Sequence, residues 1–155
     1  MLDGAVRIDA LVQRAKELKM PAVALTDHGN VFGAIDFYMD AQKGMKKAAG
    51  KAVDKLTEKN PEVTKDELAA AKAAAMRAEV QPILGCEIYV APGSMFDKKE
   101  VTGRKRSSHL TLLAGSNLGF ENLSKLVTRG HLDGSYMDEP RVDKASMSEI
   151  GRAHV

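Results

Sequence analysis

Residues 21–30 read PAVALTDHGN, and this stretch decides the fold class. Residues 22–25 form a short, unbroken apolar run, which is typical of a strand buried on both faces in a parallel sheet. The polar residues 26–30 follow at once. In parallel α/β folds, functional side chains gather at the carboxyl ends of the strands. Asp27 and His28 are therefore the first candidates for chemistry.

Two later segments repeat the strand pattern, and helical patterns precede the first strand, lie between the first and the second, and follow the third. Residues 82–90 are β-rich and nearly all apolar, and residues 109–114 form a further run of this kind. Apolar residues recur at helical spacing over 8–18, and again after a cap at Ser116 or Asn117. Strands that alternate with helices predict an α/β fold with parallel strands, either a doubly wound sheet or part of a (βα) barrel.

The segment 41–80 differs in composition from its surroundings. Alanine and lysine dominate it, and Asn60-Pro61 in its middle is a turn signal. Thr64 and Glu67 form a capping-box pattern ahead of an alanine-rich run. We predict a helical hairpin that is inserted into the domain and exposed to solvent. The alternative is that it binds a partner.

Composition excludes several classes of protein. The chain has 155 residues, 44% of them hydrophobic, which suffices for one domain with a buried core. Its 23 Lys+Arg and 21 Asp+Glu leave a net charge of +2, so any contact with nucleic acid must be local. A single cysteine excludes an internal disulfide, and no apolar run approaches the ~20 residues of a membrane span. We expect a cytoplasmic protein without a signal peptide or a membrane partner.

Four polar side chains near the predicted strand ends carry metal-binding chemistry. Glu87 stands alone among apolar neighbours, where an unpaired carboxylate is costly. His109 begins the next strand, and His28 follows Asp27. Imidazole and carboxylate groups hold zinc or manganese in hydrolytic sites. The residues alone leave other interpretations open: His28 on a surface loop, Asp27 as a helix cap, and His109 in a backbone hydrogen-bond network.

The remaining reactive residues have simpler interpretations. Cys86 fits a small buried hydrophobe. His131 lies in a turn-like segment and is predicted to be exposed. The predicted loop 91–108 is basic, and its charges are either a solvated run or contacts to nucleic-acid phosphates. The basic residues proposed for such contacts are Arg104, Lys105 and Arg106.

Several segments together resemble the polymerase and histidinol phosphatase (PHP) domain that opens the alpha subunit of bacterial replicative DNA polymerase III. They are LDGA at 2–5, MPAVALTDHGN at 20–30, FGA at 32–34, GCEIYV at 85–90, HLTLLA at 109–114 and PRVD at 140–143. The resemblance covers nearly the whole chain except the predicted hairpin. It implies a distorted seven-stranded, TIM-like (βα) barrel, of which this chain forms a part.

The resemblance also implies a set of site residues. Asp3, His28, Glu87 and His109 match metal-ligating positions of the family, and Asp27 matches a partner that orients a ligand. The complete domain is expected to hold two or three zinc or manganese ions. Family members with the full ligand set resemble metal-dependent phosphoesterases, some with 3′–5′ exonuclease activity. Others use the domain only as a structural support.

The chain departs from the family pattern at both ends. The family's His-x-His pair before Leu-Asp-Gly is absent, as are a later Cys or His ligand and an Asp-x-His pair beyond Asp143. We therefore expect residues 1–148 to be a partial PHP domain, with an incomplete metal site and no activity in isolation. Residues 149–155 do not continue the pattern, so we expect a non-native tail there, and His154 is not counted as a ligand.

The expected function is part of DNA replication, within a DNA-directed DNA polymerase (a nucleotidyltransferase) whose catalytic carboxylates lie outside this chain. DNA, a proofreading exonuclease and the sliding clamp are the expected partners. Two alternatives stay open: a non-catalytic module that docks a proofreading subunit or DNA, and a stand-alone PHP-family phosphatase. Residues 140–143 resemble the polymerase branch and argue against the phosphatase.

Overall fold

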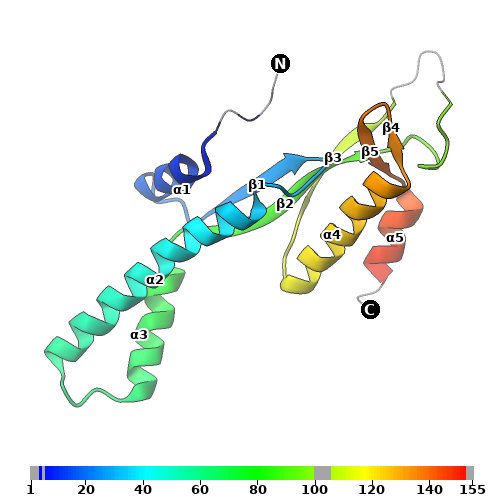
Figure 1. The fold of residues 1–155 in the computed structure, drawn as a ribbon. Helices are drawn as coiled ribbons and strands as arrows, with labels where there is room; N and C mark the ends of the chain where they lie inside the picture. The colour runs from blue at the N-terminus through cyan, green and yellow to red at the C-terminus, as the bar shows by residue number, and fades with distance from the viewer. Residues whose placement is uncertain (1–3, 5, 100–105, 153–155) are drawn as a thin grey trace. The chain divides into compact units, whose positions relative to one another are not determined.

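The computed structural model describes residues 4, 6–99 and 106–152 (Figure 1). The helices are α1 (Ile8–Glu17), α2 (Ala34–Lys59), α3 (Lys65–Arg77), α4 (Asn117–Leu132) and α5 (Lys144–Arg152). The strands are β1 (Ala22–His28), β2 (Gln81–Val90), β3 (Ser108–Leu113), β4 (Ser135–Tyr136) and β5 (Glu139–Val142). In the described part of the chain, no helix combines the length and the apolar character that a membrane crossing demands.

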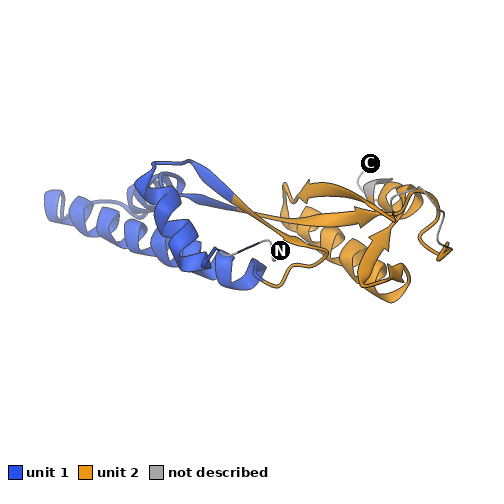
Figure 2. Cartoon of the chain, turned by 90° about the horizontal axis from the view of Figure 1, so that it is seen from above, with its two compact units in different colours: residues 1–23, 33–82 blue, residues 24–32, 83–155 orange. Residues whose placement is uncertain are grey.

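The chain divides into two compact units, coloured separately in Figure 2. Unit 1 comprises residues 1–23 and 33–82 and contains α1, α2 and α3. Unit 2 comprises residues 24–32 and 83–155 and contains β3, β4, β5, α4 and α5. The strands β1 and β2 contribute residues to both units.

In unit 1, α2 and α3 pack against each other on either side of the turn at 60–64. The predicted capping box is confirmed: the Thr64 hydroxyl accepts a hydrogen bond from the Glu67 amide, and the Glu67 carboxylate accepts one from the Thr64 amide. α3 has no fully buried residue. Its stability therefore depends on partial packing against α2, on its cap and on the high helix propensity of alanine.

The sheet has the strand order β1-β2-β5-β4, and β3 also pairs with β2. β5 runs parallel to β2, as the sequence pattern predicted for the whole sheet, but β3 runs antiparallel to it, with Gly85 opposite Leu113 and Val90 opposite Ser108. The prediction of parallel strands is therefore wrong for β3. Between these two strands the described residues, 91–99 and 106–107, contain no helix. Antiparallel neighbours need no helical crossover, whereas parallel ones usually do.

The core of unit 2 lies between one face of the sheet and the helices α4 and α5. Its buried residues come from β2, α4 and β5, with partly buried residues of α5 packed against them. The buried residues are Cys86, Ile88, Leu123, Leu126, Val127 and Val142. Successive strand residues point to opposite faces. Cys86 and Ile88 face this core, and Glu87 between them faces the other side of the sheet.

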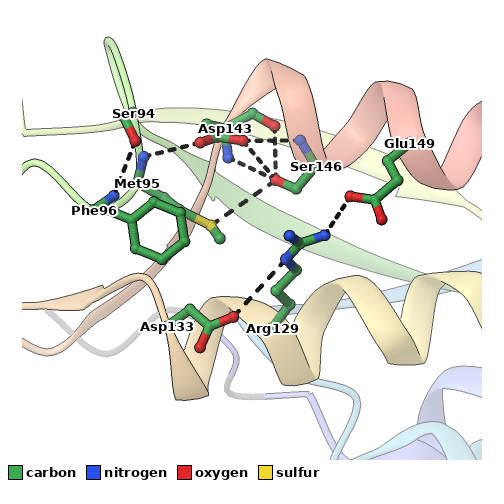
Figure 3. Close-up of polar contacts among 8 residues, drawn as sticks. All are labelled: Ser94, Met95, Phe96, Arg129, Asp133, Asp143, Ser146 and Glu149. Atoms are coloured by element: carbon green, nitrogen blue, oxygen red, sulfur yellow. Dashed lines mark hydrogen bonds and ion pairs between the residues drawn. The ribbon is translucent and has the colours of Figure 1, made fainter.

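Helix α5 runs through residues that the sequence analysis assigned to a tail. It ends at Arg152, and Ile150 packs against the core of unit 2. Glu149 pairs with Arg129 of α4 at 2.6 Å, and Arg129 also lies 3.8 Å from Asp133 (Figure 3). Residues 149–152 thus extend a packed helix, and the foreign origin of 149–155 stays a prediction.

Candidate metal centre

Three of the predicted ligands, His28, Glu87 and His109, come together in unit 2. One donor atom from each lies within 4.8 Å of the others. His28 Nδ1 is 3.6 Å from Glu87 Oε1, and His109 Nδ1 is hydrogen-bonded to the same oxygen. All three side chains are partly exposed to solvent. An ion can therefore reach the cluster from outside.

The strand register explains why these residues meet. β1 ends at His28, and Glu87 lies near the carboxyl end of β2. His109 is the second residue of β3 and lies opposite Tyr89, two residues beyond Glu87. Residues on diagonal positions of one sheet face are close enough for long side chains to touch. The antiparallel direction of β3 thus brings the beginning of that strand to the carboxyl end of β2.

Tyr89 completes the surroundings of the two imidazoles, and the sequence analysis did not identify it. Its ring centroid lies 4.9 Å from that of His109, with the ring planes 75° apart, and 6.4 Å from that of His28. Edge-to-face contacts of this kind restrict how a ring can rotate. The signal in the sequence was its position two residues after Glu87, which places both side chains on one face of β2.

The turn after β1 is ordered by Asn30. Its side-chain amide donates to the His28 carbonyl oxygen at 2.9 Å, and its side-chain oxygen accepts from the Phe32 amide at 3.0 Å. Asparagine favours such turns because its short side chain reaches neighbouring backbone groups. These two hydrogen bonds of the Asn30 side chain therefore fix the backbone next to the His28 imidazole.

The donor set fits a divalent transition metal. Two imidazole nitrogens and one carboxylate oxygen are the ligands of many hydrolytic zinc sites, in which a fourth position stays open for water. Manganese is also compatible with carboxylate and imidazole donors. Ligands must give up protons to bind a metal. Metal binding therefore replaces the hydrogen bond between His109 Nδ1 and Glu87 Oε1.

Cys86 and Asp27 neighbour the ligands in sequence. Cys86 is fully buried in the core, as predicted. Burial raises the pKa of its thiol to about 11, and the negative charge of Asp27 adds to the rise. Strand alternation places Asp27 on the face of β1 opposite His28. That it orients a metal ligand stays a prediction.

Several predicted site residues lie outside the described part of the chain. They are Asp3, Arg104 and Lys105, together with His154, which was not counted as a ligand. Arg106 is exposed, and its carbonyl oxygen accepts a hydrogen bond from Arg141 at 3.3 Å. A contact between Arg106 and nucleic acid stays a prediction.

Comparison with known proteins places the whole sequence in one family. The family model of the PHP domain matches residues 1–153. The DNA polymerase III subunit alpha of Borreliella burgdorferi is 36% identical over 149 residues, which cover 96% of this chain and 10% of the relative. The subunit of the same name from Thermus aquaticus is 36% identical over 152 residues, covering 96% and 10%. That from Aquifex aeolicus is 33% identical over 157 residues, covering 97% and 10%.

These relatives are far longer than the chain. The chain spans about a tenth of the length of the curated relatives it matches. With a family model that extends over nearly every residue, and three converging donors on one face of its sheet, the chain belongs to the PHP domain family.

Proposed function

We propose that this PHP domain binds zinc or manganese through His28, Glu87 and His109, as part of a metal-dependent phosphoesterase or 3′–5′ exonuclease site. The observation that carries the proposal is the convergence of one carboxylate and two imidazoles within 4.8 Å, from three different strands. A metal held there supplies positive charge for a phosphate oxygen and lowers the pKa of a bound water.

The protein's own residues hold and orient this centre. The Glu87 carboxylate faces both imidazoles, and Tyr89 packs beside the His109 ring. Asp3 belongs to the proposed ligand set through the family resemblance, which also implies two or three ions in the complete domain. Because the full ligand set is larger than these residues, we propose that the isolated chain binds metal weakly and does not hydrolyse phosphate esters robustly.

Calorimetric titration of the metal-stripped chain with zinc, and separately with manganese, tests the proposal. Glu87→Gln is the test variant, and Glu62→Gln, at an exposed turn of unit 1, is the control with the same change of charge. Loss of a direct ligand should weaken zinc binding by more than the ~10–100-fold that an outer hydrogen-bond partner contributes. Binding to Glu87→Gln with unchanged affinity and stoichiometry would overturn the metal site.

We propose that the parent protein is the alpha subunit of a bacterial DNA polymerase III, a cytoplasmic nucleotidyltransferase of DNA replication. The relatives that carry this name support the proposal. DNA, a proofreading exonuclease and the sliding clamp are the proposed partners. Sequencing the genomic DNA on both sides of the gene segment tests the assignment. Polymerase sequence downstream is expected, and an immediate stop codon would favour a stand-alone phosphatase.

A second candidate role, contact with DNA, is favoured by the lysines of α2. Residues 41–53 contain four lysines and no acidic residue. All four are exposed, and among the described residues only Lys43 has an ion-pair partner, Asp40 at 4.0 Å. The four are Lys43, Lys46, Lys47 and Lys51, and we call them the lysine face.

The lysine face lies on a different side of α2 from the buried residues of that helix, and Lys43 and Lys47 line a surface pocket beside α1. The buried residues of this part of α2 are Ala41, Met45 and Ala49. Lys43, Lys47 and Lys51 each follow one of them by two positions, which is about 200° around a helix. The charges are therefore held in solvent, where DNA phosphates can approach, and each contacted phosphate releases counterions.

The salt dependence of DNA binding tests this role. The test variant is Lys47→Gln with Lys51→Gln, and the control with equal charge is Lys125→Gln with Lys144→Gln on exposed positions of α4 and α5. For a fluorescent DNA duplex, each phosphate-contacting lysine that is removed should reduce the slope of log affinity against log salt by about 0.9. If the slope falls equally in both variants, the effect depends on net charge alone, and the lysine face is excluded as the DNA contact.

A further inference from the structure

His131 connects the end of α4 to the turn that carries the His28 ligand. Its Nε2 lies 2.8 Å from the carbonyl oxygen of Gly29, a residue 102 positions away. A carbonyl oxygen only accepts hydrogen bonds, so the His131 ring donates through Nε2. His131 is exposed, as the turn-like segment predicted, but one of its ring nitrogens forms a hydrogen bond.

Gly29 is also fixed from its other sides. Its amide donates to the Glu87 carbonyl oxygen at 2.8 Å. Its φ is +64°, and a Cβ atom there would lie 2.8 Å from Pro140 Cγ and 2.9 Å from Tyr89 Cε2. Both polar groups of Gly29 are therefore bonded, and the residue fits between two rings. A displacement of Gly29 must move the adjoining His28.

We propose that His131 is a positioning residue of the metal centre: its hydrogen bond to Gly29 holds the His28 imidazole within reach of Glu87. This inference rests on the proposed function. His131 is not one of the three converging donors and does not ligate with them. It acts through the backbone, in the way that hydrogen-bond partners outside the ligand set orient ligands and contribute to metal affinity.

The position of His131 makes this role separable from a role in folding. The residue is exposed, so its replacement leaves no cavity in the core. The core of unit 2 is built instead from α4 residues such as Leu123 and Leu126. Substitution of His131 is therefore expected to change metal affinity with little change in the thermal unfolding midpoint.

Zinc titration of three variants of the full chain tests the inference. His131→Phe keeps a ring but removes the donor, His131→Gln keeps a side-chain N–H donor, and Lys125→Gln on the same helix is the control. We expect about a 10-fold loss of zinc affinity in His131→Phe, substantial recovery in His131→Gln, and none lost in the control. Thermal unfolding of each metal-free variant verifies that the fold is retained.

Each outcome decides a separate point. If the wild-type chain binds no zinc, the proposed metal site fails and the positioning role fails with it. If the wild type binds zinc and His131→Phe binds it equally well, the positioning role alone fails and the metal site stands. If His131→Gln loses as much affinity as His131→Phe, a side-chain N–H donor at this position does not restore zinc binding, which also overturns the inference.

Discussion

Ser146 donates both its backbone amide and its hydroxyl to one oxygen of Asp143, each at 2.8 Å (Figure 3). The other carboxylate oxygen accepts from the Met95 amide at 3.1 Å. Asp143 directly precedes α5 and is nearly buried. It therefore caps the helix and at the same time ties the segment after β2 to it.

Asp143→Asn should make stability less dependent on pH. Burial is the largest single influence on the pKa of Asp143 and raises it, but the hydrogen bonds from Ser146 and Met95 together prevail and lower it. A lowered folded pKa stabilises the protein above the unfolded value of about 3.9, and this contribution is lost as the pH falls through the folded value. In urea unfolding, the free energies of unfolding of the wild type and the variant should differ more at pH 7 than at pH 3.

The control for this experiment is Asp54→Asn, at an exposed position of α2. It removes the same charge without removing a cap. The stabilities of wild type and Asp54→Asn should differ equally at both pH values. A difference between wild type and Asp143→Asn that stays constant from pH 7 to pH 3 would contradict the role assigned to the Asp143 charge.

Gly29→Ala should lower both stability and zinc affinity. The backbone is in the left-handed region, where a side chain costs roughly 1–2 kcal/mol, and the new Cβ would meet Pro140 and Tyr89. Urea unfolding measures the first effect and calorimetric titration the second. Gly93→Ala is the matched control, because a Cβ at Gly93 meets no atom within 4 Å. Equal stability of the two variants would show that the turn after β1 tolerates displacement.

The strands and the cap of α3 were predictable because their signals are local. An apolar run such as residues 82–90 predicts a strand whichever strand it pairs with. Thr64 and Glu67 form their capping box within one turn of helix. Strand direction is different, because an apolar run has no direction of its own. The antiparallel pairing of β3 therefore escaped prediction, although it is what brings His109 to Glu87.

The contacts that the sequence did not reveal join residues far apart along the chain. His131 and Gly29 meet only after α4 has packed on the sheet, and no spacing rule connects them. The residue types and the family resemblance predicted that His28, Glu87 and His109 share one metal site, and the three do converge, but which of their atoms touch was not predictable. The position of Tyr89 beside both imidazoles follows from strand alternation, once the face that Glu87 occupies is known.

Thr64→Ala should loosen α3 selectively. This helix buries no residue completely, so loss of the Thr64 cap should cost about 1 kcal/mol of local stability. Amide hydrogen exchange measures the effect, with faster exchange expected in α3 and unchanged exchange in α4. The control is Thr57→Ala, which removes a hydroxyl that bonds the Val53 carbonyl oxygen within α2 and does not cap the helix. Uniform acceleration across both helices would indicate global destabilisation instead of a local cap effect.

Removal of zinc should destabilise the wild-type chain but not Glu87→Gln. A ligand that binds only the folded state stabilises it by about 2.7 kcal/mol at a concentration one hundred times its Kd. Thermal unfolding of the wild type should therefore shift to higher temperature on addition of zinc and return when a chelator is added. Glu87→Gln lacks the carboxylate that faces both imidazoles, so its unfolding temperature should respond little. An equal zinc-dependent shift in both proteins would place the ion elsewhere on the molecule.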